Sequence, residues 1–349
     1  MKIKYLLLIV ILSACKERGD NLKKSFKEIE TIAIESQPVD IEENVSFSSM
    51  FKMVSVDNLI IVSEIRDPEY DLKIVNLNNG KVRKFAKRGK GPDEIKYRGV
   101  NFSIDYHTNQ LYLIDGQSSL VYAVDSLKEG NNVPFKKFSI DKSAPRMREN
   151  IYCQNNIVGM LADEPQPGFG IYDIDSEEMS RMKIPSQDSL PKGTLNNQAF
   201  LINHPSDSLV AYFHYTSGIC GILDLKNKEK IDIKSNFYWA TTNKEIKSGN
   251  KTITAHNKED ERNGFIAATS DENYIYTLYS GKSMNVNSVK ELTNAFLSNV
   301  VYVFDWEGRP IKKYQLDEEV RSITIDQKDN VLYAASYKND NPQLIKFQL

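Results

Sequence analysis

The side chains best suited to recognise a ligand are an aromatic run and a set of arginines, all lying in long polar segments between apolar runs. Phe237, Tyr238 and Trp239 are consecutive, and aromatic side chains stack on sugars or fill a partner's pockets at low entropic cost. The same run also fits a strand that packs at the edge of a sheet. Guanidinium groups bind carboxylates and phosphates through paired hydrogen bonds. The arginines in these segments are Arg66, Arg98, Arg146, Arg148 and Arg262. Each could face an anionic ligand or be a solvated surface charge.

Catalytic chemistry is poorly represented in the chain. None of the four histidines stands in an H-E-x-x-H spacing, and no G-x-S-x-G elbow occurs. The acidic run Glu259 to Glu261 is better explained as a solvated loop than as a metal site. The sequence therefore favours a protein that is not an enzyme and needs no cofactor or metal. The alternative is a hydrolase or lyase for a carbohydrate or another small substrate, because carboxylates from distant segments can converge in a fold.

Closely spaced glycines occur in the run Gly89-Lys90-Gly91-Pro92-Asp93-Glu94. Glycine-rich loops can present backbone N–H groups to a phosphate, but this one lacks the Lys-Ser/Thr ending and a following helix. A structural role is the better interpretation. We expect Gly89 and Gly91 to provide positive φ angles and Pro92 to fix a turn that connects two sheets.

The N-terminus has the pattern of a bacterial lipoprotein signal. Two lysines among the first four residues precede an apolar run over residues 5–12, and Leu12-Ser13-Ala14-Cys15 resembles a lipobox. We expect residues 1–14 to be a signal peptide, Cys15 to carry the lipid, and 15–25 to form a flexible polar tether. The alternatives are an ordinary secretory signal that is cut elsewhere and a buried N-terminal strand. The expected location is a membrane, with an outer-membrane lipoprotein facing the periplasm or the cell surface as the favoured form.

Charge and cysteine content exclude several classes of protein. The formal net charge is −2 with both signs spread along the chain, so no nucleic-acid footprint is present. Cys153 and Cys220 lie in apolar strand-like runs without C-x-x-C spacing, which disfavours a zinc ribbon or a redox pair. Two buried thiols are the simpler interpretation, and a disulfide between them stays open.

A pattern of short strands recurs along the chain. In the clearest copy, residues 102–105 lead through a polar turn to 111–115, followed by 120–125 and 135–140. Period-two alternation between Asn, Asp and Gly turns indicates antiparallel strands. The first turn of each copy falls near Asp57, Tyr106, Asn155, Ser206, Asp271 and Lys328.

A spacing of roughly fifty residues per four-stranded unit fits a β-propeller, and six units lie within the usual range of blades. We predict an all-β, six-bladed β-propeller over residues 26–349, with four-stranded antiparallel blades. The last blade would have three strands of its own, and the alternating segment 26–34 is expected to supply the fourth and close the ring. A β-sandwich or two smaller β domains would not explain the repeat.

The segment 85–95, with strand-like runs at 100–105 and 111–115 after it, resembles a blade junction of NHL-type propellers. Together with the lipobox, the chain is similar to the TolB-like six-bladed β-propeller lipoproteins over its whole mature length. This resemblance implies the propeller fold and a general role in binding or interaction, without naming a ligand.

Loop lengths predict where a ligand binds. In a four-stranded blade, the turns between strands one and two and between three and four lie on one face, which we call the short-turn face. The second-to-third connections and the crossings between blades lie on the other, the long-loop face. The longest segments, including 88–99, 235–264 and 281–298, belong to the second group. We therefore expect a protein or carbohydrate ligand at the channel end on the long-loop face. A purely structural assembly subunit is a further alternative.

Overall fold

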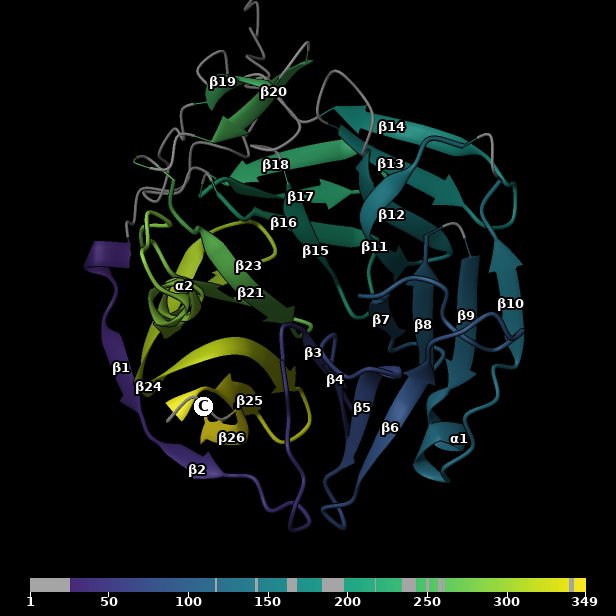
Figure 1. Cartoon of the computed structure of the whole chain (residues 1–349), viewed down its shortest axis with the longest axis horizontal. Helices are drawn as coiled ribbons and strands as arrows, with labels where there is room; N and C mark the ends of the chain where they lie inside the picture. Colours follow the sequence, from purple (N-terminus) through teal and green to yellow (C-terminus); the bar gives the residue numbers. More distant parts are fainter. Residues whose placement is uncertain are drawn as a thin grey trace, which may run out of the picture.

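Short apolar runs become the strands of a ring of β-sheets around a central channel, as Figure 1 shows. The structure is a computed structural model. It describes residues 26–116, 118–141, 144–161, 168–183, 198–216, 218–233, 243–248, 251–256, 259, 261–338 and 342–349.

Within the described residues, six four-stranded antiparallel blades follow one another around the ring. Blade 1 consists of β3 (Met53–Val56), β4 (Leu59–Ser63), β5 (Tyr70–Asn76) and β6 (Val82–Lys87). Blade 2 consists of β7 (Asn101–Asp105), β8 (Gln110–Asp115), β9 (Ser118–Ala123) and β10 (Lys136–Ser139). Blade 3 consists of β11 (Met147–Cys153), β12 (Asn156–Leu161), β13 (Gly168–Asp173) and β14 (Met179–Lys183). Blade 4 consists of β15 (Ala199–Asn203), β16 (Leu209–His214), β17 (Cys220–Asp224) and β18 (Glu229–Ile233). Blade 5 consists of β21 (Phe265–Ser270), β22 (Tyr274–Tyr279), β23 (Ser298–Asp305) and the first half of the long strand β24 (Pro310–Asp326). Blade 6 consists of the second half of β24, β25 (Val331–Ser336), β26 (Gln343–Gln348) and β2 (Ser36–Pro38).

Strand burial follows from the position of each strand in its blade. Every residue of β4 is buried, because neighbouring blades cover both faces of a middle strand. The outermost strand β10 is mostly exposed. Aromatic pairs with ring centroids 3.7 to 5.0 Å apart fasten successive blades together, and they are Phe85 with Tyr122, Tyr112 with Tyr152, Phe169 with Tyr212, and Phe213 with Phe265.

The N-terminal segment closes the ring, but with a different strand from the one expected. Ser36 to Pro38 form β2, which pairs antiparallel with β26 and completes blade 6. The alternating segment is instead β1 (Thr31–Ile34), which pairs in parallel with β24 on the outer edge of blade 5. Between these strands, the backbone N–H and hydroxyl of Ser36 donate to the carboxylate of Asp317, at 3.1 and 3.0 Å. This contact fixes the step from one blade to the next. The expectation that residues 26–34 would close the ring is wrong, because β1 pairs with blade 5 and β2 is the strand that completes blade 6.

The two faces of the ring differ as loop lengths predict, with one exception. The connection from β22 to β23 contains α2 (Val289–Ala295), and the crossing from blade 4 to blade 5 contains the hairpin of β19 (Asn243–Ser248) and β20 (Lys251–His256). Both connections belong to the long-loop face by strand order. The exception is the β9 to β10 connection on the short-turn face, which contains α1 (Val124–Lys128).

Both cysteines of the body are buried free thiols, Cys153 in β11 and Cys220 in β17. The structure therefore holds no disulfide between them. Burial raises the pKa of each thiol. They act as small apolar side chains in the packing of blades 3 and 4.

Candidate functional site

The innermost strands of all six blades enclose a cavity of about 250 Å³ in the central channel. Most of its lining residues are apolar, and one lining residue from each of the six innermost strands illustrates this: Val54, Phe102, Ile151, Ile202, Ile266 and Ile323. A concave, mainly apolar cavity with a few polar groups is the usual form of a small-molecule site. We call this cavity the channel pocket.

Hydrogen bonds join the blades at the end of the channel nearer the short-turn face. The side-chain amide of Asn203 donates to the carbonyl of Ile104 at 3.0 Å, which joins blade 4 to blade 2. The hydroxyl of Ser270 donates to the carbonyl of Asn203 at 2.9 Å, and that of Tyr106 donates to the carbonyl of Ser55 at 3.2 Å. Because these bonds occupy the polar groups at this end, the pocket's available polar groups lie toward the long-loop face.

Lys52 brings an amine into this apolar wall, directly before β3. Its Nζ lies 5.0 Å from the ring centroid of Phe102, and it makes no ion pair or side-chain hydrogen bond with any residue in the described part of the chain. Burial lowers the pKa of the Lys52 amine to about 8, and the nearby charge of Glu149 acts in the opposite direction. The channel thus holds an amine that the chain itself leaves without a bonded partner.

Glu149 enters the channel because β11 is irregular at this point. The register of β11 against β12 shifts between Arg148 and Ile151, which is a β-bulge, and Glu149 itself has a φ of 52°. Bulges redirect side chains, and a non-glycine residue in the left-handed region is strained. Burial raises the pKa of the Glu149 carboxyl, while Lys52, a hydrogen bond from Tyr215 and Arg148 oppose that rise.

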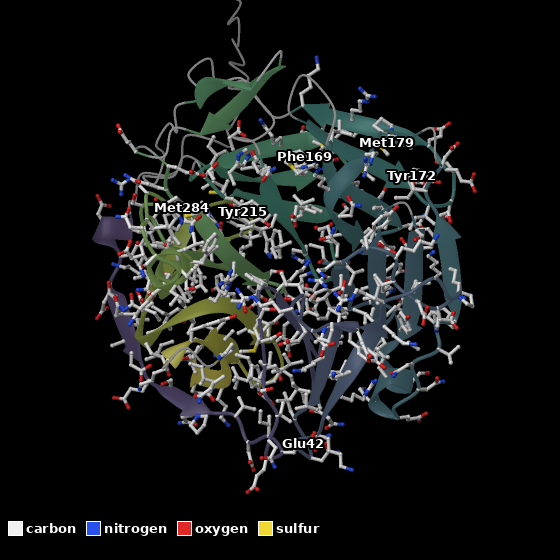
Figure 2. The ribbon with its side chains drawn as sticks, viewed as in Figure 1. Glu42, Phe169, Tyr172, Met179, Tyr215 and Met284 are labelled. Atoms are coloured by element: carbon white, nitrogen blue, oxygen red, sulfur yellow. The ribbon has the colours of Figure 1, made fainter. Side chains whose placement is uncertain are left out.

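Tyr215 completes a group of three titratable side chains that we call the channel cluster: Lys52, Glu149 and Tyr215. It follows β16, and its hydroxyl donates to Glu149. Burial and the charge of Glu149 raise the pKa of Tyr215 well above its usual value. Its ring lies 5.3 Å from that of Phe200, and Figure 2 shows Tyr215 on the inner side of the ring. Shifted pKa values converging in one cavity are typical of functional sites.

A further cation, Arg321 of β24, is set among aromatic rings next to the channel. Its guanidinium carbon lies 3.7 Å from the ring centroid of Phe51 and 5.0 and 5.7 Å from those of Phe296 and Tyr337. Burial lowers the pKa of Arg321 to about 10, Tyr337 raises it, and Arg66 lowers it further. These rings support the cation through their negative faces.

The arginines singled out in the sequence are all exposed, at strand ends or in connections on the long-loop face. Arg66 acts on Arg321, and Arg148 acts on Glu149, so these two lie near the channel. Arg262 instead donates to the carbonyl of Gly281 at 3.2 Å. No described contact joins Arg98 or Arg146 to the pocket. Tyr238, Trp239 and Cys15 lie outside the described residues.

The sequence did not indicate the titratable residues of the pocket lining, which are Lys52, Glu149 and Tyr215. Nor did it indicate Arg321, which lies over the ring of the lining residue Phe51. Lys52 directly precedes an apolar run, and Glu149 stands two residues before one, so both positions are typical of an ordinary strand boundary. The one local signal is Glu149 itself, because a charge between Met147 and Ile151 interrupts the alternation of a strand.

The glycine run is structural, but for a different reason from the one expected. Neither Gly89 nor Gly91 has a positive φ. Instead, the carboxylate of Glu94 folds back into the loop, where it accepts from the backbone N–H of Gly91 at 2.8 Å. A Cβ at Gly89 would overlap this carboxylate. The glycines therefore provide space, and an acid from the chain itself occupies the position that a phosphate would need.

Two other kinds of feature are absent from the described residues. No three His, Cys, Asp or Glu side chains gather as a metal site would require there. In the same residues, no helix has the length and apolar character needed to cross a membrane.

Three solved structures with a similar fold come from Bacteroides species. A member of the DUF4221 family from Bacteroides vulgatus has a TM-score of 0.55 at 10% identity, covering 92% of this chain and 96% of that one. A protein of unknown function from Bacteroides thetaiotaomicron has a TM-score of 0.55 at 12% identity, with coverages of 92% and 75%. An auxiliary nutrient binding protein from the same species has a TM-score of 0.50 at 10% identity, with coverages of 87% and 70%. At these identities the likeness shows the fold alone.

No curated protein matches the chain. A sequence model of the family described as TolB-like 6-blade propeller-like matches residues 26–328, which is well over half of the chain. That match agrees with the six blades of the ring. The chain belongs to the TolB-like six-blade propeller family.

Proposed function

We propose that the protein is a binding module that takes a small ligand into the channel pocket from the long-loop face. The observation that carries this proposal is the pocket itself, whose apolar wall contains the channel cluster. A rigid ring that presents a few polar groups within an apolar cavity can orient a ligand at low entropic cost. One propeller of similar fold is described as an auxiliary nutrient binding protein, which is a role of the same kind.

Blocking the pocket tests this proposal, with the dye 1-anilinonaphthalene-8-sulfonate as the probe. Val54 lines the pocket, so Val54→Trp should fill part of it. We expect saturable binding of one dye molecule to the wild-type protein, weakened about tenfold or more by Val54→Trp. The matched control is Val133→Trp, at a position 62% exposed in the β9 to β10 connection. Absence of saturable binding, or equal binding by both variants, would refute the proposal.

We further propose that a lipid at Cys15 tethers the propeller to the cell envelope, with the outer membrane as the expected site. The support is the lipobox-like run that ends at Cys15 and the polar segment after it. Cells fed radiolabelled palmitate should label the wild-type protein and not Cys15→Ser. Equal labelling of the two proteins, or labelling of neither, would contradict lipidation.

An enzyme at the channel mouth is the second candidate, favoured by the shifted pKa values of the channel cluster. Glycoside hydrolysis by the common mechanisms needs two carboxylates. Among the described lining residues, Glu149 is the one carboxylate, and no histidine is present. Binding therefore explains the pocket better.

A further inference from the structure

The amine of Lys52 lacks what other partly buried cations of blade 1 possess. The amine of Lys73 donates to the carbonyl of Ser46 and lies 3.8 Å from the carboxylate of Glu64. The guanidinium of Arg88 lies 3.0 Å from the carboxylate of Asp71. Buried charges are normally paired in this way, because removal from water costs several kcal/mol per ion. Lys52 has only the face of Phe102 and, within the described residues, no carboxylate in contact.

Cations without acid partners surround the same end of the channel. Arg66, Arg148 and Arg321 make no ion pair with the described residues. Three acids of this face are paired with other cations: Asp67 with Lys84, Asp71 with Arg88, and Glu319 with Lys282. The surplus of positive charge near the pocket should attract anions.

The rest of the wall is suited to an apolar body rather than to a fully hydrated ion. Ile151, Ile202 and Ile266 line the pocket together with the rings of Phe102 and Phe200. An inorganic anion would lose its hydration here without enough donors to replace it. A ligand that combines one anionic group with an apolar chain or ring would satisfy both parts of the site.

We propose that the ligand is a small organic acid with an apolar body, and that its carboxylate pairs with the ammonium group of Lys52. This inference rests on the proposed binding function of the channel pocket and names the ligand class. Glu149, held by the hydroxyl of Tyr215, then lies next to the incoming carboxylate and opposes it unless it takes up a proton.

Proton uptake follows from this arrangement. In the free protein the pKa of Lys52 is about 8, and burial raises the pKa of Glu149. A carboxylate bound beside them raises both pKa values, because it stabilises the ammonium and destabilises a second carboxylate. The charge of Arg148 also acts on Glu149, and that of Arg66 acts on Arg321. Binding of the acid should therefore take up protons and weaken as the pH rises through 8 to 10.

Three probes that share one apolar body test the proposal on the full-length protein by calorimetry at pH 7. They are the anion 4-phenylbutyrate, the neutral 4-phenylbutyramide and the cation 4-phenylbutylamine. We expect the anion to bind about tenfold or more tightly than the amide, and the cation to bind most weakly. At pH 8.5, titrations in phosphate and Tris buffers should show proton uptake for the anion and none for the amide.

Two variants should change the preference in opposite directions. Lys52→Met should reduce the affinity for 4-phenylbutyrate to that for the amide. Glu149→Gln should increase it by about threefold to tenfold, because the repelling charge is removed. A merely damaged pocket would not bind the anion more tightly. Lys96→Met is the matched control, since Lys96 is an exposed lysine on the same face and should change affinity less than about twofold.

The outcomes separate this inference from the proposed function. Equal affinity for anion and amide, or tightest binding of the cation, would overturn the inference and leave the pocket as a binding site. Binding of none of the three while 1-anilinonaphthalene-8-sulfonate still binds would do the same. If the dye fails as well, the proposed function falls together with the inference.

Discussion

Two lysines of blade 1 have the same aromatic neighbourhood and opposite electrostatic situations. Nζ of Lys52 lies 5.0 Å from the ring centroid of Phe102, and Nζ of Lys73 lies 5.0 Å from that of Phe47. The chain supplies Lys73 with a carbonyl and the carboxylate of Glu64, whereas it supplies Lys52 with neither. Partial burial alone therefore does not distinguish a lysine that binds a ligand. The distinguishing feature is that the fold provides no carboxylate or carbonyl partner for its amine.

The largest effect should come from removing the partnered lysine. Lys73→Met leaves the carboxylate of Glu64, which is 1% exposed, without its cation. We expect a loss of about 2 to 4 kcal/mol in the free energy of unfolding, because an unpaired buried charge remains. The backbone N–H of Ser48 still donates to Glu64, which keeps the loss below the upper end of such values. Urea unfolding measures it, and a change below 0.5 kcal/mol (about the scatter of neutral surface substitutions) would contradict the pairing.

The glycine run from Gly89 to Glu94 is a second region in which the chain provides its own partner, here the carboxylate of Glu94 for the backbone N–H of Gly91. Gly89→Ala places a Cβ against the carboxylate of Glu94, so we expect a loss of about 1 to 2 kcal/mol in the free energy of unfolding. The loss should shrink in a Glu94→Ala background, where the overlap is absent. A double-mutant cycle measures this coupling, and strict additivity would show that Glu94 does not occupy the loop.

Removing the unpartnered lysine should stabilise the ligand-free protein. Lys52→Met replaces a cation in an apolar wall with an apolar chain, so we expect a gain of about 1 to 2 kcal/mol at pH 7. The pKa of Lys52 is about 8 in the folded protein, below the ordinary lysine value of 10.5, so the unfolded chain binds more protons between these two values. Wild-type stability attributable to Lys52 therefore rises with pH across this window, and the advantage of the variant should disappear by pH 10. A pH-independent difference would argue against a buried amine.

The smallest effect should come from replacing Glu149, whose backbone is strained and whose carboxylate acts on Lys52. Glu149→Gly relieves a φ of 52° and removes a buried acid, and we expect a gain of about 0.5 to 1 kcal/mol in thermal unfolding experiments. The matched control is Glu177→Gly, at a turn position with a φ of 58° and an exposed side chain. A clear loss for Glu149→Gly alone would mean that this carboxylate supports the fold and not the site.

The fold could be predicted from the sequence because its signals are local and repeated. Alternating runs and Asn or Asp turns recur in each blade, and Asp57, Asn109 and Asn155 do adopt the positive φ that such turns require. The closing strand could not be placed in the same way. Thr31 to Ile34 alternate more regularly than Ser36 to Pro38, but the choice between two sheet edges depends on contacts such as Ser36 with Asp317.

The sequence predicted a ligand at the channel but not the residues of the channel pocket, because these come from different blades and none belongs to a motif. Lys52 and Glu149 are 97 residues apart in the sequence and meet only after the ring closes. Sequence reasoning gave weight to exposed arginines, since charge in a long loop is visible without a structure. The strain and burial that distinguish Glu149 exist only in three dimensions.

The most direct test of the account is a titration of the lysine side chains by NMR, following the 13Cε resonances of the full-length protein with and without 4-phenylbutyrate. The resonance missing from Lys52→Arg identifies Lys52. We predict a pKa of about 8 in the free protein and a clear rise when the acid is bound. Two results would contradict the proposal that the amine of Lys52 has no partner in the free protein and binds the carboxylate of a ligand. One is an ordinary lysine pKa for Lys52 in the free protein, and the other is a pKa of Lys52 that 4-phenylbutyrate leaves unchanged.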